Sequence, residues 1–218
     1  MKKKVNISAQ DRNQLIADDN RKLFESKGVF TINIIGSPGC GKTSILEHMS
    51  NHFDEQFAVV VGDVKTALDS DRIINSGNKN AFAIETGGGC HLSAQMIQNK
   101  LKEINLDHLD YLFIENVGNL ICPSSFDLGE NLKIAILSIP EGDEKVRKYP
   151  TLFIRAAAVI INKIDLLGVM DYDIERVKQD CRVHNTEVKI FETSAKTGQG
   201  LDEWYQLLRD QRKYLFSE

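Results

Sequence analysis

A glycine-rich segment constrains the fold more than any other part of this chain. It reads Gly36-Ser37-Pro38-Gly39-Cys40-Gly41-Lys42-Thr43 and follows an apolar run of strand length. The segment fits the pattern G-x-x-x-x-G-K-[ST], in which glycines let backbone N–H groups curl inward toward phosphate oxygens. A helix that begins near Lys42 adds the positive end of its dipole. We therefore expect a phosphate-binding loop, in which Lys42 reaches the β- and γ-phosphates and Thr43 ligates Mg²⁺. The residues expected around the phosphates are Gly36, Ser37, Gly39, Cys40, Gly41, Lys42, Thr43 and Ser44.

The size and composition of the chain favour one globular domain. Its 218 residues suffice for one sizeable core, and 42% hydrophobic with 27% charged residues is ordinary for a soluble protein. The net charge of −4 provides no basic field, so no nucleic-acid partner is expected. No apolar run approaches the roughly 20 residues of a membrane span, and no signal peptide follows the start. We expect a cytoplasmic protein without a membrane partner, whose cysteines are reduced.

Apolar runs of strand length alternate with segments of helical period, which is typical of a βαβ architecture. The expected strands cover 29–35, 57–61, 81–85, 111–115, 132–138, 157–161 and 187–191. The expected helices cover 42–53, 66–76, 91–104, 171–183 and 201–215. A further helix over 9–26 has Leu15, Ile16 and Leu23 on one apolar side. The predicted fold class is α/β: a P-loop NTPase with a mostly parallel central sheet flanked by helices, plus an N-terminal helix. Residues 1–28 are expected to form the N-terminal helical extension and 29–218 a single P-loop GTPase domain.

Two motifs at strand ends indicate which base the nucleotide carries. Asn162-Lys163-Ile164-Asp165 matches the N-K-x-D pattern of guanine-specific proteins. The Asp165 carboxylate can accept two hydrogen bonds from guanine, and adenine offers neither donor in that arrangement. The Lys163 stem can cover the base, and Asn162 can brace the loop. One strand later, Ser194-Ala195-Lys196 resembles the S-A-K element of G proteins, whose backbone N–H at the alanine position points at guanine O6. Together the motifs predict GTP as the ligand.

Two acidic residues end strands near the expected γ-phosphate. Glu115 occupies a Walker-B-like position, where an apolar strand delivers a carboxylate to the Mg²⁺ shell. Asp63 is expected either to hold Mg²⁺ through water or to orient the attacking water. The expected Mg²⁺ group is therefore Thr43, Asp63 and Glu115, and the expected catalytic group for hydrolysis of GTP to GDP and phosphate is Lys42, Asp63 and Glu115. Since Glu115-Asn116-Val117-Gly118 replaces the D-x-x-G of Ras proteins, an ordinary Ras-type switch is not expected.

Two thiols and an imidazole follow neighbouring expected strands. Cys90 and His91 come after a glycine-rich turn, and Cys122 follows the strand that ends at Glu115. Thiolate and imidazole suit Zn²⁺ and Ni²⁺. Three protein ligands leave a tetrahedral site incomplete, so either water completes it or two chains share it across a symmetric interface. The residues alone also permit a purely structural alternative, in which the two cysteines are core residues, the histidine caps a helix, and none of the three binds a metal.

Taken together, the motifs resemble HypB, the GTPase family that assists nickel insertion during [NiFe]-hydrogenase maturation. The most specific stretch is Glu115-Asn116-Val117-Gly118-Asn119-Leu120-Ile121-Cys122-Pro123, followed by Phe126-Asp127-Leu128-Gly129. The resemblance implies a GTP-promoted homodimer with Cys90, His91 and Cys122 as ligands of Ni²⁺ or Zn²⁺. It also implies a HypA-like accessory protein and a hydrogenase large subunit as partners.

Three other interpretations compete with this one. UreG, which serves urease, resembles the chain less, because UreG has a Cys-Pro-His pattern whereas Cys90 and His91 are adjacent here. A P-loop small-molecule kinase would need an acceptor lid that the sequence lacks. A purely structural metal or interaction protein would bind GTP without turnover. Some HypB proteins also carry an N-terminal cysteine- or histidine-rich segment, and residues 1–30 contain neither residue type, so a single metal site is expected.

Overall fold

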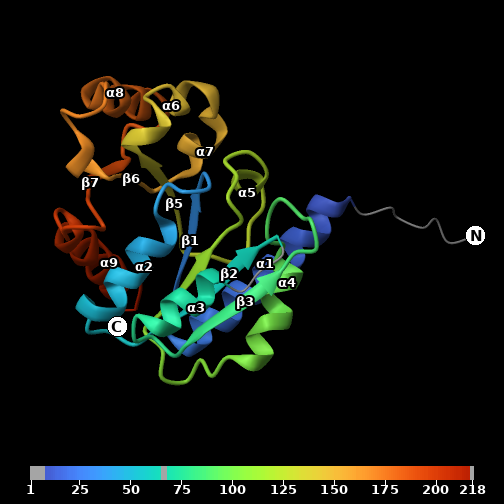
Figure 1. Ribbon diagram of the computed structural model, residues 1–218. Helices are drawn as coiled ribbons and strands as arrows, with labels where there is room; N and C mark the ends of the chain where they lie inside the picture. Colours follow the sequence, from blue (N-terminus) through green and yellow to red (C-terminus); the bar gives the residue numbers. More distant parts are fainter. Residues whose placement is uncertain (1–7, 65–67, 217–218) are drawn as a thin grey trace, which may run out of the picture.

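The computed structural model describes residues 8–64 and 68–216, and its centre is a seven-stranded sheet (Figure 1). The strand order is β3-β2-β4-β1-β5-β6-β7, and each neighbouring pair is parallel. The strands are β1 (Phe30–Gly36), β2 (Phe57–Asp63), β3 (Ala81–Glu85), β4 (Tyr111–Glu115), β5 (Leu132–Ser138), β6 (Ala158–Asn162) and β7 (Lys189–Glu192). All seven expected strands form, and the predicted α/β class is confirmed.

Helices cover both faces of the sheet. The long ones are α1 (Ala9–Lys27), α2 (Lys42–His52), α3 (Leu68–Asn75), α4 (Ala94–Lys100), α8 (Ile174–His184) and α9 (Leu201–Phe216). The helix expected over 66–76 starts outside the described residues. Side chains of α2, α3 and α9 pack on one face, while α1 and α4 cover β2 and β4 on the other. Helix α8 and a short helix, α7 (Pro150–Arg155), cover β5 and β6 on that second face.

Short helical turns were not expected from the sequence. They are α5 (Cys122–Ser125), α6 (Lys145–Lys148) and α7, together with the 3₁₀ turns η1 (Leu101–Glu103), η2 (Ile139–Glu141) and η3 (Ile164–Leu166). A single turn is too short to display a helical period, which explains the omission. The turn η1 also ends α4 earlier than the predicted 91–104 helix.

The N-terminal helix buries a different side from the one that its apolar residues predict. Leu15 is 58% exposed and Leu23 37% exposed. The residues that α1 buries are Asn13, Ala17, Asn20 and Phe24. The two asparagine side chains can lie on the buried side of α1 because their amides hydrogen-bond to backbone groups that are distant in the sequence. The apolar pattern therefore indicated the wrong side of this helix.

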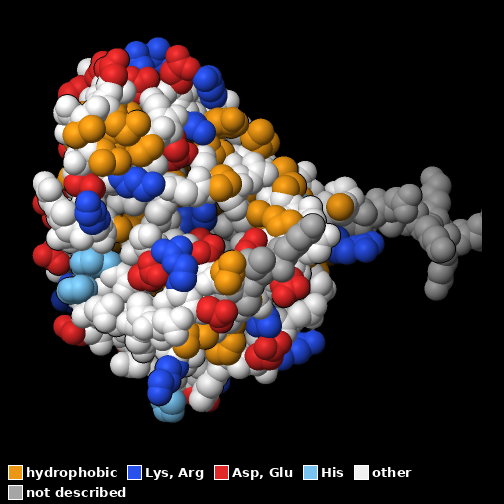
Figure 2. Space-filling model, in the orientation of Figure 1, with side chains coloured by type: hydrophobic (Ala, Val, Ile, Leu, Met, Phe, Trp, Pro, Cys, Tyr) orange, Lys and Arg blue, Asp and Glu red, His pale blue; other side chains and the backbone are white. Residues whose placement is uncertain are grey.

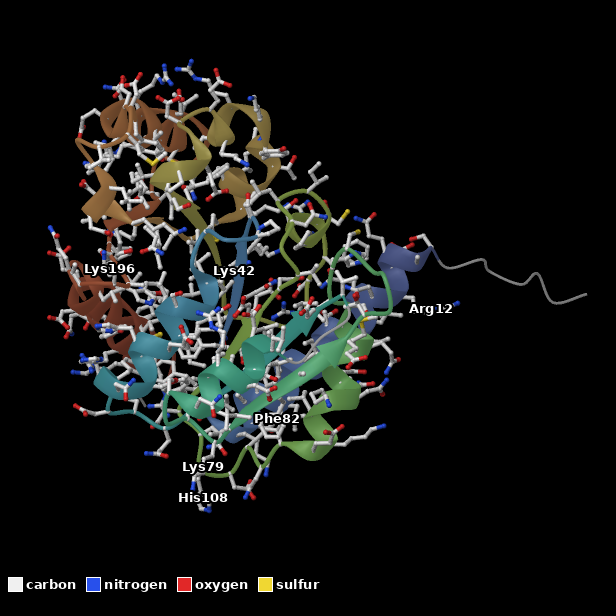
Figure 3. The ribbon with its side chains drawn as sticks, viewed as in Figure 1. Arg12, Lys42, Lys79, Phe82, His108 and Lys196 are labelled. Carbon is white, nitrogen blue, oxygen red and sulfur yellow. The ribbon has the colours of Figure 1, made fainter. Side chains whose placement is uncertain are left out.

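The two ends of the sheet differ in what they carry. Lys42 and Lys196 lie toward the carboxyl ends of the strands, whereas Lys79 and His108 lie at the opposite end (Figure 3). Acidic and basic side chains are interspersed over the face shown in Figure 2; they crowd its top edge, over α8 and α6, and hydrophobic side chains gather just below that edge. Among the described residues, no helix combines the length and the apolar character needed to cross a bilayer.

Candidate functional site

The phosphate loop joins β1, the central strand, to α2. Gly36 ends the strand and Lys42 begins the helix. Gly41 has φ 103, and a Cβ atom there would lie 2.2 Å from Asn162 Nδ2. Both the backbone angle and the close approach require glycine at this position. The loop therefore fits against the guanine-motif segment with no room for a side chain.

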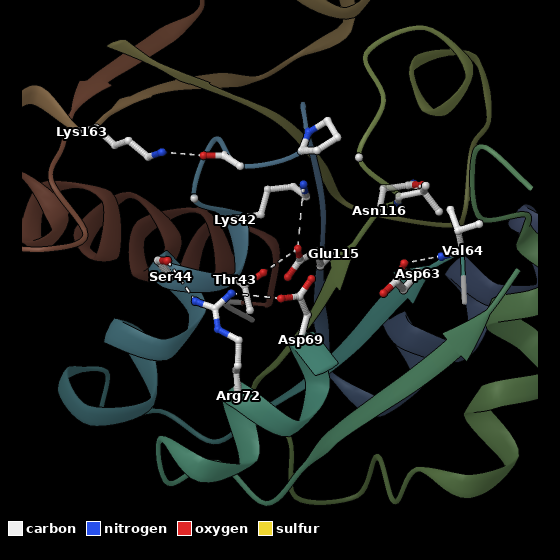
Figure 4. A pocket seen from close by; sticks show the side chains of 16 residues that line it. Lys42, Thr43, Ser44, Asp63, Val64, Asp69, Arg72, Glu115, Asn116 and Lys163 are labelled. Carbon is white, nitrogen blue, oxygen red and sulfur yellow. Dashed lines mark hydrogen bonds and ion pairs between the residues drawn. The ribbon is translucent and has the colours of Figure 1, made fainter. Parts of the chain in front are cut away.

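A buried carboxylate lies directly beside the loop (Figure 4). The Thr43 hydroxyl donates to Glu115 Oε1 at 3.0 Å, and Lys42 Nζ is 3.9 Å from the same oxygen. Burial raises the pKa of Glu115 to about 7, although Lys42 and the Thr43 hydrogen bond oppose the shift. Among the described residues, Glu115 Oε2 has no hydrogen-bond partner. Since a buried acceptor without a partner is costly, an oxygen-seeking cation such as Mg²⁺ fits beside Thr43 and Glu115.

Asp63 and Glu115 line the same cavity of about 330 Å³, together with Lys42 and Thr43. Asp63 ends β2, and the backbone N–H of Val64 donates to its carboxylate. Most of the expected phosphate and Mg²⁺ residues therefore line one cavity, namely Gly39, Gly41, Lys42, Thr43, Ser44, Asp63 and Glu115, whereas Gly36, Ser37 and Cys40 do not line it. Arg72 of α3 also lines this cavity and was not expected there from the sequence. Arg72 donates to Ser44 Oγ at 3.3 Å and pairs with Asp69 at 3.0 Å (Figure 4). Its guanidinium also pairs with Glu47 at 2.7 Å.

The guanine motifs lie around a second cavity, of about 600 Å³, beside the first. Asn162 Nδ2 donates to Cys40 O at 3.0 Å, which ties this motif to the phosphate loop. Ser194 Oγ donates to Asp165 Oδ1 at 2.5 Å. The Ala195 N–H, expected to point at a base, donates to Asn162 Oδ1 at 3.1 Å.

Two histidines of α2 were not expected at this cavity. The His48 and His52 rings stack with centroids 3.9 Å apart, and His48 Nδ1 is 2.8 Å from the Tyr205 hydroxyl. Both rings line the cavity. Their helical spacing of four residues places them on one side of α2, but nothing in the sequence indicates that this side meets the guanine motifs.

Lys163 has the only positive φ, 64°, among the described residues other than glycine. This left-handed backbone directs its side chain back across the phosphate loop, where Nζ donates to Gly39 O at 2.6 Å (Figure 4). Lys163 lines both cavities. Its stem therefore lies where it can cover a bound nucleotide, at a backbone cost of roughly 1–2 kcal/mol.

The expected metal ligands meet at the surface. One ligand atom each from Cys90, His91 and Cys122 lie within 4.8 Å of one another. Cys90 Sγ is 3.6 Å from His91 Nδ1, and the imidazole stacks on Phe126 with centroids 4.0 Å apart. The hydrogen bond with Cys122 raises the pKa of Cys90, while partial burial lowers the pKa of His91. A neutral imidazole and two thiols that can lose protons to a cation suit a borderline-soft divalent metal.

One segment connects the phosphate cavity with the metal cluster. Asn116 follows Glu115 and lines the phosphate cavity. Its Oδ1 accepts the N–H of Leu92, the residue after His91, at 3.0 Å. Asn119 Nδ2 donates to Cys90 O at 3.3 Å. The segment from Glu115 to Cys122 therefore contacts both sites, and Asn116 is a residue whose contact the motif alone does not predict.

The fold and these sites define a P-loop nucleotide-binding protein with a Cys/His cluster beside its phosphate cavity. Residues 30–192 match the family described as CobW/HypB/UreG, nucleotide-binding domain. The chain is 41% identical to the hydrogenase maturation factor HypB of Escherichia coli over 210 residues, 95% of this chain and 72% of that protein. It is 43% identical to the hydrogenase/urease maturation factor HypB of Helicobacter hepaticus, over 89% of this chain and 83% of that one.

Solved structures give the same result. The crystal structure of HypB from Helicobacter pylori in complex with nickel matches with a TM-score of 0.89 at 39% identity, and covers 95% of this chain and 98% of that one. HypB from Archaeoglobus fulgidus matches with a TM-score of 0.84 at 39% identity, over 92% and 98%. The chain belongs to the CobW/HypB/UreG family and, within it, to the HypB proteins.

Proposed function

We propose that this protein is a GTP-hydrolysing metallochaperone that binds nickel or zinc at a Cys/His site and assists nickel insertion into [NiFe]-hydrogenase. The observation that carries the proposal is the Glu115–Cys122 segment, which contacts the phosphate cavity at one end and the Cys/His cluster at the other. The printed names of the HypB relatives support the maturation role, and the nickel complex of the Helicobacter pylori protein supports the metal. The UreG-like and kinase alternatives are not favoured.

The nucleotide roles follow the expected motifs. Lys42 balances charge on the β- and γ-phosphates, and the phosphate loop supplies backbone N–H groups. Mg²⁺ is held by Thr43 and Glu115, directly or through water, with Asp63 beside them. Water then attacks the γ-phosphate, and Asp63 orients it while GDP leaves. The base contacts are assigned to Asn162, Lys163, Asp165, Ser194, Ala195 and Lys196.

The metal is the cargo of this cycle. Cys90, His91 and Cys122 supply three ligands, and the fourth comes from water or from the second chain of a GTP-promoted homodimer. The Glu115–Cys122 segment contacts both the nucleotide cavity and the metal cluster. The nucleotide therefore changes the affinity for metal, and the metal changes the affinity for nucleotide by the same factor. By family resemblance the partners are a HypA-like accessory protein and a hydrogenase large subunit. Of the predicted N-terminal extension over 1–28, residues 1–7 lie outside the described residues, and α1 (Ala9–Lys27) serves as the helical extension of the GTPase domain predicted over 29–218.

A metal titration of Cys122→Ala tests the metal assignment. We expect this variant to bind Ni²⁺ and Zn²⁺ far more weakly while its GTP affinity stays nearly intact. Cys181→Ala is a matched control, because Cys181 is a buried thiol in the hydrophobic core and does not belong to the Cys/His cluster. Equal metal affinity in the wild type and in Cys122→Ala would contradict the assignment.

Phosphate release tests the nucleotide assignment. With no acceptor present, GTP should be turned over and ATP should not. Release that requires an added acceptor would support a kinase. A complete absence of turnover with GTP would support a structural or interaction role.

A further inference from the structure

The motif Phe126-Asp127-Leu128-Gly129 lines neither the phosphate cavity nor the cavity around the guanine motifs. Each of its residues instead packs against or bonds to another part of the chain. Phe126 stacks on His91, and the Asp127 carboxylate pairs with Arg21 of α1 at 2.7 Å. Leu128 is fully buried. A Cβ atom on Gly129 would lie 2.7 Å from Ala17 O, so only glycine allows this close approach to α1. The segment that follows Cys122 is thus fitted to the N-terminal helix.

Asn13 of α1 joins this segment to the one that carries the other two ligands. Its Nδ2 donates to Asp127 O at 2.7 Å, and its Oδ1 accepts the N–H of Ala94 at 2.9 Å. Ala94 begins α4, shortly after Cys90 and His91. One amide that is 8% exposed therefore bonds to the backbone on both sides of the metal cluster.

Asn20 repeats the same bridge two turns further along α1. Its Nδ2 donates to Ala94 O at 3.0 Å and to Leu128 O at 3.1 Å, and the residue is 1% exposed. Both amides thus contact the same two segments, and both occupy positions where an apolar side chain would pack at lower desolvation cost. Hydrogen bonds from buried amides fix the distance between these two segments, whereas apolar packing alone would leave that distance adjustable.

We propose that Asn13 and Asn20 are positioning residues for the metal site, which set the distance between Cys90–His91 and Cys122 through α1. The inference rests on the proposed function only in that it takes the cluster to be the metal site. Neither asparagine contacts a ligand atom, so both act through the backbone at Ala94 and at residues 127 and 128. Figure 1 shows α1 lying beside α4, on the opposite side of the sheet from α2.

The test compares Asn13→Ala and Asn20→Ala with Ala17→Gly. Ala17 lies between the two asparagines on the same buried side, and its glycine variant weakens the helix while keeping both amides. Zn²⁺ and Ni²⁺ affinities are measured by competition with a chromophoric chelator, and GDP affinity and melting temperature are measured alongside. Loss of a group hydrogen-bonded to a metal ligand typically lowers affinity by roughly 10- to 100-fold, and because the asparagines act one step further from the ligands we expect a loss of up to about 10-fold in both variants. Ala17→Gly should retain wild-type metal affinity although its melting temperature is similar to those of the asparagine variants. GDP affinity should stay unchanged in all three variants.

A second probe needs no metal. A trivalent arsenical that bridges two neighbouring thiols reports whether Cys90 and Cys122 remain close, because their sulfur atoms lie within 4.8 Å in this structure. Arsenical capture should weaken in the two asparagine variants and persist in Ala17→Gly. Asn13→Asp keeps the acceptor for Ala94 but places a buried carboxylate oxygen against the Asp127 carbonyl oxygen, so the loss should be at least as large as in Asn13→Ala.

The two proposals fail in different ways. Wild-type protein that captures the arsenical but binds neither Ni²⁺ nor Zn²⁺ would end the proposed metal function, and the arsenical series would still decide the role of the asparagines. Asparagine variants that match Ala17→Gly in both probes would overturn the positioning role. Wild-type protein that fails to capture the arsenical would overturn it as well.

Discussion

The nucleotide cavity and the metal cluster lie next to each other but are built in opposite ways. Lys42 is 7% exposed, Thr43 6% and Asn162 1%, so this part of the nucleotide site is enclosed by the chain itself, whereas Asp165 and Lys196 at the base cavity are exposed. Cys90 is exposed, and Ile121 beside Cys122 is 62% exposed. We therefore propose that the enclosed phosphate site is complete within one chain, whereas the three-ligand cluster at the surface takes its fourth ligand from water or from a second chain.

The largest expected effect is on nucleotide turnover, and the metal cluster should not be affected. Lys42→Ala removes the cation that we propose neutralises the phosphates, and loss of one such electrostatic contact should lower turnover by roughly 100- to 1,000-fold. Metal affinity measured without nucleotide should stay at the wild-type value, because Lys42 contacts no residue of the cluster. Phosphate release and a metal titration on the same preparation check both halves. A simultaneous loss of metal affinity without nucleotide would show that the two sites are not separable.

The buried Glu115 carboxylate gives the nucleotide side a pH dependence. Burial raises its pKa from the ordinary 4.5 to about 7, so as the pH rises the unfolded chain releases this proton before the folded protein does. The free energy of unfolding should therefore fall between about pH 4.5 and 7, by up to about 3 kcal/mol. Glu115→Gln, which cannot titrate, should flatten this part of the profile. Urea unfolding across the range, without nucleotide or Mg²⁺, measures it, and an unchanged slope in the variant would assign the dependence to another group.

Asn116 offers a way to weaken the connection between the two sites. Its Oδ1 accepts the Leu92 N–H, and its Nδ2 donates to Asn33 Oδ1 at 3.1 Å. Coupling between two sites is typically about 1–3 kcal/mol, and Asn116→Ala should reduce the change in metal affinity that GTP causes. Metal titrations with GDP, with a non-hydrolysable GTP analogue and without nucleotide measure that change. Asn119→Ala, which removes the partly exposed contact with Cys90 O, serves as the comparison variant. Full coupling in Asn116→Ala would rule out this contact as the connection.

The two regions also differ in how far the sequence predicts them. The phosphate loop and the guanine motifs are contiguous stretches at the ends of apolar strands, so their placement follows once the strands are recognised. The Cys/His cluster depends on the strand order, which a βαβ pattern limits but does not determine. The bridge from Asn13 to Asp127 joins residues 114 positions apart, and no local pattern reports it. For the same reason the apolar residues of α1 indicated the wrong side, since the buried side is chosen by distant backbone partners.

The smallest effect concerns the backbone at Lys163, where strain and function meet in one residue of the nucleotide side. Its left-handed conformation costs an ordinary residue roughly 1–2 kcal/mol and costs glycine much less. Lys163→Gly and Lys163→Ala both remove the stem that lies over the phosphate loop, but only the glycine variant also relieves the backbone. The glycine variant should therefore be more stable than the alanine variant by about 1 kcal/mol in urea unfolding, while both lose nucleotide affinity to a similar extent. Metal affinity without nucleotide should not change in either. Equal stability of the two variants would mean that the conformation carries no cost, and that the lysine is favoured here for its contact with Gly39 alone.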